Sequence, residues 1–393
     1  MSEELRKRYL RQPISKGELE RRWKVVRTEM VKEHLDCLVM HSTGRFLGGA
    51  VRYFTGIQAG VYGSFLVFPL LGEQTLISHG YPSPPSPPEW AVFDTERISL
   101  PYIPSINFTN DMPASAAVNA IKRAKAKSVG IVGMSMMASS FSQYLRTKMT
   151  NVVIKDATDM LDAIRADKSP EEINLMQMTC DLQDKAMYST LAMVRPGVRE
   201  YEIMSEIKRI CTDMGSEEQL VFIGTAPGGI NSGHKPEFFQ NRTLQDGDYM
   251  TLLIETNGPG GYWTEIAREI CIGDAPKVLL KAWDDAVEMQ KENAKVFKPG
   301  ANAKALWDFQ NKLLVSRGYS KEERLSCHSQ GCDIVERPAI RLEETMSLKE
   351  DMVLAIHPTP KTKEVYVDCC DNFLITSKGG VRMHKCPQRV FVV

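Results

Sequence analysis

A pattern that occurs twice in the second half of the chain restricts its fold more than any other feature. Residues 194–203 (VRPGVREYEI) and 297–306 (FKPGANAKAL) each close one predicted helix, and an amphipathic helix follows each of them. The apolar strands DYMTLLIET (248–256) and DMVLAIHPT (351–359) come next, at matching positions. A helix–helix–sheet unit that is duplicated in this way predicts two half-domains, whose equivalent strands face each other across a central cleft.

The two matched strands carry polar residues at equivalent places. Glu255 near the end of the first strand corresponds to His357 near the end of the second. If the two halves face each other, polar side chains at matching positions of apolar strands converge on one cleft. The alternative is that two unrelated strands each end in a polar residue, and the pattern alone leaves this alternative open.

The first part of the chain alternates helical and strand signals and predicts a small α/β domain. Helices are expected near residues 17–34 and 112–126. The prolines of YPSPPSPPEW (81–90) exclude a helix or an interior strand, so this segment is predicted to be a stiff loop, with a polyproline ligand as the alternative. Apolar runs that predict strands are LDCLVMHS (35–42), GSFLVFPL (63–70), EQTLISHG (73–80) and KSVGIVGMS (127–135).

A helix start marks the border between the two parts. Ser169 is suited to cap a helix, Pro170 to occupy its first position, and Glu172 to complete a capping box. The expected domains are therefore 1–160, an α/β domain, and 161–393, the domain that contains the duplicated unit.

The balance of charged residues and the number of cysteines limit which partners and which cellular compartment are expected. Lys+Arg and Asp+Glu number 49 each, so no general attraction to nucleic acid or to an anionic membrane is expected. The nine scattered cysteines favour reduced thiols over a disulfide framework. The charged start MSEELRKRYLRQ lacks the apolar core of a signal peptide, and no apolar run approaches the length of a membrane span. We expect a cytoplasmic protein.

Candidate functional residues cluster in the second domain. Glu255 and Glu265 flank a glycine-rich turn, and they pair across two strands if that turn closes a hairpin. The chain has neither a Gly-x-x-x-x-Gly-Lys loop nor a Gly-x-Ser-x-Gly elbow, which argues against nucleotide hydrolysis and serine-hydrolase chemistry. A structural zinc at Cys327 and Cys332 is a weak alternative. The other polar candidates are His234, His328, His357, Asp368, Cys370 and Asp371.

Several motifs, taken in order, resemble the pita-bread family of methionine aminopeptidases, prolidases, aminopeptidase P and creatinase. The resemblance covers about residues 20 to 380 and implies a small N-terminal α/β domain followed by a pita-bread domain with a pseudo-twofold repeat. It also implies a homodimer. The motifs are AVRYFTG (50–56), IRADKSPEEI (164–173), GHKP (233–236), GYWTEIARE (261–269), CHSQGCDIVERP (327–338), MVLAIHP (352–358) and VDCCDNFLIT (367–376).

The resemblance also indicates which residues replace the family's metal ligands. Metallopeptidases of this fold use two aspartates, one histidine and two glutamates around two ions, and a second family histidine corresponds here to Val335. Longer carboxylates and the loss of the bridging carboxylate disfavour a dinuclear site. We expect no metal cofactor, and the alternative is one divalent zinc or iron ion. The residues at the five ligand positions are Glu255, Glu265, His328, His357 and Cys370.

These replacements lead to a functional hypothesis. Creatinase has the fold without metal ions, so we expect a metal-free hydrolase that cleaves a C–N bond of a small cationic non-peptide substrate, creatine-like or ectoine-like. His234 would be the general acid–base, and Glu255 and Glu265 would bind the substrate or attack it. His328 and His357 would complete the proton network. Tyr262, Cys370 and Asp371 are the expected further substrate contacts.

Three other functions remain open at this point. The first is a metal-dependent Xaa-Pro aminopeptidase or prolidase with altered ligands. The second is a lyase on the same fold that acts by proton abstraction. The third is a catalytically inactive scaffold that binds partners.

Overall fold

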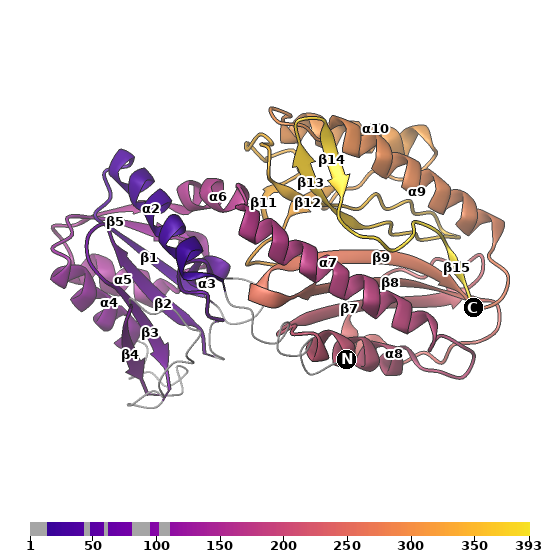
Figure 1. The fold of residues 1–393 in the computed structure, drawn as a ribbon, viewed down its shortest axis with the longest axis horizontal. Coiled ribbons are helices and arrows are strands. Elements are labelled where there is room, and N and C mark those ends of the chain that lie inside the picture. The colour runs from indigo at the N-terminus through magenta and orange to yellow at the C-terminus, as the bar shows by residue number, and fades with distance from the viewer. Residues whose placement is uncertain (1–13, 43–47, 59–61, 81–94, 102–110) are drawn as a thin grey trace. The chain divides into compact units, whose positions relative to one another are not determined.

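The computed structural model describes residues 14–42, 48–58, 62–80, 95–101 and 111–393 (Figure 1). The chain packs as two compact units, one of them Pro13–Arg165 and the other containing Ala166–Val393. The predicted border after residue 160 lies close to this division. The proline-rich segment 81–90 lies outside the described residues. Among the described residues, no helix combines the length and the apolar character that a membrane crossing requires.

The first unit is built on a mixed sheet, as the alternation of helix and strand signals predicts. In the described residues the sheet has six strands in the order β4-β3-β2-β1-β5-β6. Helices α2 (Lys16–Lys32), α3 (Gly49–Thr55), α4 (Met112–Arg123), α5 (Ser139–Lys148) and α6 (Thr158–Ala166) accompany it. The strands are β1 (Cys37–Ser42), β2 (Ser64–Pro69), β3 (Gln74–His79), β4 (Thr95–Leu100), β5 (Ser128–Val132) and β6 (Val153–Asp156).

The second unit contains the duplicated helix–helix–sheet pattern, which confirms the predicted repeat. The first half has α7 (Pro170–Leu191), α8 (Glu200–Asp213), β7 (Gln219–Pro227), β8 (Asp248–Asn257) and β9 (Trp263–Cys271). The second half begins with α9 (Lys277–Val296) and α10 (Ala303–Ser316). Its strands are β10 (Cys327–Ser329), β11 (Glu336–Ala339), β12 (Val353–Ile356), β13 (Asp371–Thr376) and β14 (Gly379–Arg382), and the short β15 (Phe391–Val392) pairs with β9.

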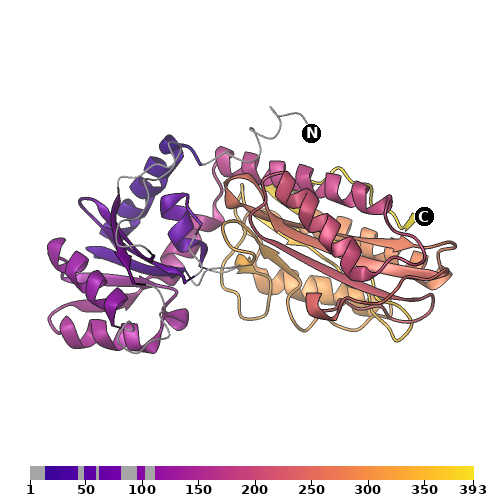
Figure 2. The same ribbon diagram turned by 90° about the horizontal axis from the view of Figure 1, so that it is seen from below.

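The helices of each half cover the outer side of their own sheet. Helices α7 and α8 pack on β7–β9, α9 packs on β12 and β14, and the two sheets lie between these helical layers (Figures 1 and 2). Each helical layer buries apolar side chains against its sheet, and this burial drives the layered packing. The predicted capping box forms at the start of α7, where the Ser169 side chain accepts from the Glu172 N–H and the Glu172 carboxylate accepts from the Ser169 N–H.

A buried ion pair joins the two sheets. The guanidinium of Arg268 on β9 donates to Asp371 Oδ1 on β13 at 2.7 Å, and both side chains are fully buried. Arg268 also donates to the carbonyl oxygen of Cys370 at 3.0 Å, and the Ala267 N–H donates to the same carbonyl at 3.1 Å. Burial opposes ionisation of Asp371, but Arg268 outweighs it and lowers the pKa of this carboxyl. The ion pair therefore stays charged and links the two halves.

We expect Arg268→Met to destabilise the second unit, because it leaves the buried Asp371 carboxylate without its closest cation. Removing one partner of a buried pair costs about 3–5 kcal/mol, which urea unfolding would detect as a lower midpoint. Lys281→Ala is the control, since Lys281 pairs with Asp285 at the surface with 69% of its side chain exposed. The control should change the midpoint little. An unchanged midpoint for Arg268→Met would contradict the role of this link.

Candidate active site

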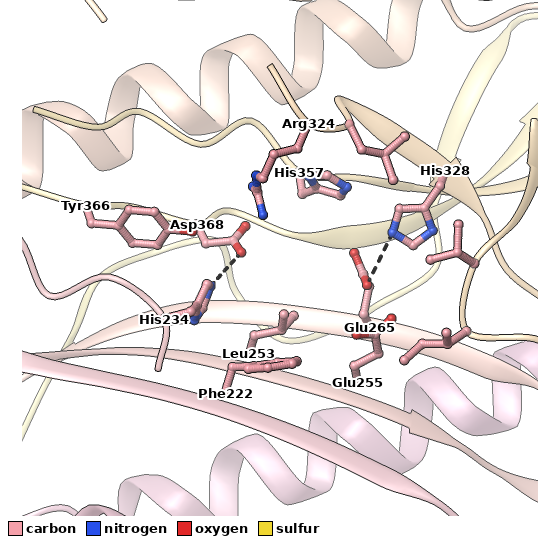
Figure 3. Close-up of a pocket in the computed structure, with 13 residues that line it drawn as sticks. Phe222, His234, Leu253, Glu255, Glu265, Arg324, His328, His357, Tyr366 and Asp368 are labelled. Carbon is pink, nitrogen blue, oxygen red and sulfur yellow. Dashed lines mark hydrogen bonds and ion pairs between the residues drawn. The ribbon is translucent and has the colours of Figure 1, made fainter. Parts of the chain in front are cut away.

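One cavity of about 260 Å³ brings together all five residues that were predicted to be catalytic (Figure 3). They come from four separate places in the second unit: the loop after β7, the paired strands β8 and β9, strand β10, and the end of β12. The five residues are His234, Glu255, Glu265, His328 and His357. The duplicated fold thus brings polar side chains from both halves together in one cleft, as the repeat predicts.

The two glutamates form a carboxyl pair. Glu255 on β8 lies directly opposite Glu265 on β9, so the predicted hairpin is confirmed. Burial and the charge of Glu265 raise the pKa of Glu255 well above its usual range. Burial also opposes ionisation of Glu265, but His328 and His357 outweigh it and lower the pKa of Glu265. The pair therefore holds one proton on Glu255 and one negative charge on Glu265.

The Cys370 thiol acts as a hydrogen-bond donor in this cluster. Its Sγ lies 2.9 Å from Glu265 Oε1. Burial, followed by the charge of Glu265, raises the thiol pKa well above its usual value, so the sulfur keeps its proton. A protonated thiol stabilises the Glu265 carboxylate instead of serving as a thiolate nucleophile.

None of the three predicted substrate contacts lines the cavity, although the Cys370 thiol contacts Glu265, which does. The Tyr262 hydroxyl donates to Glu172 Oε1 on α7 at 2.7 Å. The Asp371 carboxylate accepts from Arg268 and Arg382, at 2.7 and 3.1 Å. The substrate-binding roles of Tyr262, Cys370 and Asp371 stay predictions.

Three side chains in the cavity form a group that fits a metal ion. One ligand atom from each of Glu265, His328 and His357 lies within 4.8 Å of the others. The His328 Nδ1–H donates to the Ser329 carbonyl at 3.1 Å, which leaves the lone pair of Nε2 directed at Glu265, 3.6 Å from Oε2. Burial lowers the pKa of His328, which favours the neutral imidazole that a metal ligand requires. One carboxylate and two imidazoles are a donor set that zinc and other divalent transition metals accept.

A histidine–aspartate pair lies elsewhere on the cavity wall. His234 Nε2 is 2.9 Å from Asp368 Oδ2, and the rings of Tyr366 and Phe222 meet the His234 ring edge-on (Figure 3). His234 Nδ1 and Asp368 Oδ1 are buried and have no hydrogen-bond partner among the described residues. If Nε2–H donates to Asp368, the lone pair of Nδ1 is free to exchange a proton. This pair is a candidate acid–base group.

Glu269 holds the His234 loop and the Asp368 segment in place. Its Oε1 accepts from the Asp368 N–H at 3.1 Å, and its Oε2 accepts from the Thr251 hydroxyl at 2.8 Å. The Thr251 oxygen is in turn 2.8 Å from the hydroxyl of Ser232, two residues before His234. One buried carboxyl therefore connects both segments that carry the acid–base pair.

Sequence reasoning missed some residues in and beside the cavity, and it gave no role to one that it named. Asp368 was among the polar candidates, but its pairing with His234 was not predicted, because that contact joins segments far apart in the chain. Arg324 lies in an irregular loop, where no periodic signal exists. Gln330, which donates to Glu255 Oε1 at 3.1 Å, follows a three-residue strand that is too short to be recognised by alternation.

Comparison with known proteins identifies relatives of this chain. The family model for metallopeptidase family M24 matches residues 174–386. The Xaa-Pro dipeptidase of Pyrococcus horikoshii is 25% identical over 263 residues, which cover 66% of this chain and 73% of that protein. The ectoine hydrolase of Halomonas elongata is 24% identical over 281 residues, covering 67% and 70%.

Solved structures share the fold over nearly the whole chain. The X-Pro aminopeptidase of Thermotoga maritima superposes with a TM-score of 0.79 at 16% identity and covers 94% of this chain and 99% of that one. The prolidase of Pyrococcus horikoshii gives a TM-score of 0.74 at 20% identity, covering 93% and 99%. These likenesses confirm the predicted pita-bread fold with its N-terminal α/β domain.

Two predictions are wrong. The non-peptide guanidine or amidine substrate is contradicted by relatives and structural neighbours that are Xaa-Pro dipeptidases and prolidases. The absence of a metal cofactor is contradicted by the match to a metallopeptidase family and by the group of Glu265, His328 and His357. Both errors arose because the changed ligand residues were interpreted as a lost metal site, although three of them still converge as ligands.

We expect Glu269→Gln to alter how stability depends on pH. Burial raises the pKa of Glu269 well above 4.5, so the unfolded chain loses this proton before the folded chain does. The wild type should therefore lose stability as the pH rises above 4.5, until the folded-state pKa is passed. Glutamine cannot ionise, and its amide can still accept from the Asp368 N–H and donate to Thr251.

Urea unfolding at about pH 4 and about pH 7 measures this difference. The stability of Glu269→Gln relative to the wild type should increase from the lower to the higher pH. The same relative stability at both pH values would show that Glu269 is not kept neutral by the fold.

Proposed function

The chain belongs to metallopeptidase family M24, and we propose that it hydrolyses short Xaa-Pro peptides with one divalent metal ion. The observation that carries this proposal is the convergence of Glu265, His328 and His357 in one small cavity. Relatives named Xaa-Pro dipeptidase support the substrate class. The volume of about 260 Å³ is at the small end for ligand sites, which favours a dipeptide over a long chain.

The proposed ion would be held by Glu265, His328 and His357. A divalent ion in such a site acts as a Lewis acid toward a carbonyl oxygen. The proposal names one ion, because Glu265, His328 and His357 form the group whose ligand atoms lie within 4.8 Å of one another. Gln330 donates to Glu255 Oε1 at 3.1 Å and so holds the neutral carboxyl in place beside Glu265.

In the proposed mechanism, His234 moves the proton that the reaction needs. The nitrogen of a proline amide must gain a proton before it leaves as a secondary amine. Asp368 holds His234 through Nε2 at 2.9 Å, which orients the Nδ1 atom and stabilises the imidazolium that forms. Phe222 and Tyr366 flank the ring and limit its rotation. A free carboxylate at the end of a dipeptide would find a cation in Arg324, which lines the same cavity.

Metal binding and peptide cleavage test the proposal directly. The purified protein, loaded with zinc, manganese or cobalt, should bind about one ion per chain and release free proline from Xaa-Pro dipeptides. His328→Ala and His357→Ala should each lower the bound metal and the release of proline together, because each removes one ligand. His34→Asn is the matched control, since His34 is an exposed histidine of the other unit whose positive φ asparagine tolerates.

Two results would contradict the proposal. If the chain binds none of the three metals, the proposed metal site is excluded. Stoichiometric metal without release of proline from any Xaa-Pro dipeptide would exclude the substrate class.

The homodimeric state and the cytoplasmic location remain proposals that rest on the resemblance and on the composition.

We expect His234→Ala to reduce turnover by about a hundredfold or more, which is the usual contribution of a general acid–base. The bound metal should be unchanged, because His234 is not one of the three proposed ligands. Asp368→Asn should lower turnover in the same direction by weakening the orientation of the ring. Elemental analysis with steady-state kinetics separates this outcome from metal loss, and near-normal turnover of folded His234→Ala would refute the role.

A further inference from the structure

A second cavity, of about 450 Å³, lies between helix α9 and the hairpin of β13 and β14. It shares no lining residue with the candidate active site. Phe373 and Gly379 on the hairpin are buried, and α9 packs against β14 beside them (Figure 1). The cavity is therefore a feature of the folded second unit and needs no other part of the chain.

The charged residues that line this cavity are all cations. They are Lys291 and Lys295 on α9, Lys378 in the hairpin turn and Arg382 on β14. The chain as a whole has 49 acidic and 49 basic residues, so a lining with four cations and no acid is a local excess. We call this cavity the anion pocket.

Helix α9 carries acidic and basic residues with different partners. Glu288 and Glu292 lie 3.8 and 2.6 Å from Arg317, which follows α10. Lys291 and Lys295, one turn apart, instead line the anion pocket. Among the described residues, no acidic side chain forms an ion pair with either lysine or with Lys378.

The inner wall of the anion pocket adds a cation that shares its carboxylate partner with a second arginine. Arg382 donates to Asp371 Oδ1 at 3.1 Å, but the same oxygen already accepts from Arg268 at 2.7 Å. His384 lies 3.6 Å from this carboxylate and stays neutral, because burial lowers its pKa to about 4. One carboxylate oxygen thus accepts from two guanidinium groups.

We propose that the anion pocket binds a small ligand that carries two or more phosphate-type charges. Lysine ammonium groups suit phosphate as point charges, and an arginine adds directional donors. The volume exceeds that of one phosphate group, so the pocket accommodates a pyrophosphate or a small organic phosphate. Phe373 and Val381 supply an apolar wall for the organic part.

A ligand in the anion pocket would reach the strands of the candidate active site through Gln290. This buried residue lines the pocket, and its Nε2 donates to the carbonyl oxygens of Ile356 at 2.8 Å and Cys369 at 3.0 Å. Ile356 precedes His357, and Cys369 precedes Cys370. Binding should therefore slow amide hydrogen exchange in β12 and β13, which is a readout that does not depend on enzymatic activity.

Calorimetric titration of the full chain with inorganic pyrophosphate tests the proposal. We expect saturable binding that Lys291→Ala/Lys295→Ala weakens at least about tenfold, the effect of losing one charge-assisted contact. Lys291→Arg/Lys295→Arg should restore most of the affinity because it keeps the charge. The matched control is Lys304→Ala/Lys312→Ala, which removes two exposed lysines from α10 and should leave binding unchanged.

Sodium sulfate at the same ionic strength separates specific binding from general screening. If pyrophosphate fails to saturate the wild type, or if the α10 control weakens binding as much as the α9 variant, the proposal is wrong. Thermal unfolding of each variant checks that the fold is intact, and Lys378→Ala offers an independent removal of charge from the hairpin side of the pocket. Unchanged affinity in both Lys378→Ala and the α9 variant would also overturn it.

Discussion

The ion pair between Arg268 and Asp371 joins the two repeated halves of the second unit, and the candidate site depends on it. Arg268 comes from the first half, and Asp371 follows Cys370 in the second. The guanidinium also donates to the Cys370 carbonyl, so the thiol-bearing strand is held against β9. Because the pair is fully buried, loss of either partner would leave the other charge unpaired in a medium of low dielectric constant. The site therefore keeps its geometry as long as the two halves stay joined.

The same junction divides the surrounding polar residues into two regions. On the cleft side, one carboxylate and two imidazoles converge beside a protonated Glu255 and a protonated Cys370. On the side of α9, Asp371 Oδ1 accepts from both Arg268 and Arg382, and the cavity that Arg382 lines has four cationic lining residues and no acidic one. Gln290 lines the anion pocket, and its side chain donates to the backbone carbonyls of Ile356 and Cys369, which precede His357 and Cys370. A structural ion pair thus lies between a candidate catalytic centre and a candidate anion pocket.

Three side chains that could hold a metal ion still lie close together in this fold, although several residue types differ from those of the family's metallopeptidases. Glu255 and Glu265 lie where the resemblance places two aspartates, and His357 where it places a glutamate. The lengthened carboxylate of Glu265 still lies 3.6 Å from His328. The pKa of Glu255 is raised and that of Glu265 is lowered, so the two carboxyls differ in how readily they ionise. The chemistry of such a site follows from which groups keep their protons as much as from which groups are present.

The sequence by itself determined the duplicated unit and the hairpin that pairs Glu255 with Glu265, because periodicity and turn chemistry are local properties. The five residues that meet in the cleft were indicated by motifs that resemble those of the family. The sequence did not determine that Glu265, His328 and His357 remain close enough to hold an ion. It also did not determine that Asp371 neutralises Arg268, or that Asp368 orients His234. Those outcomes depend on distances between strands far apart in the chain, and on burial that shifts pKa values, and only the tertiary structure decided them.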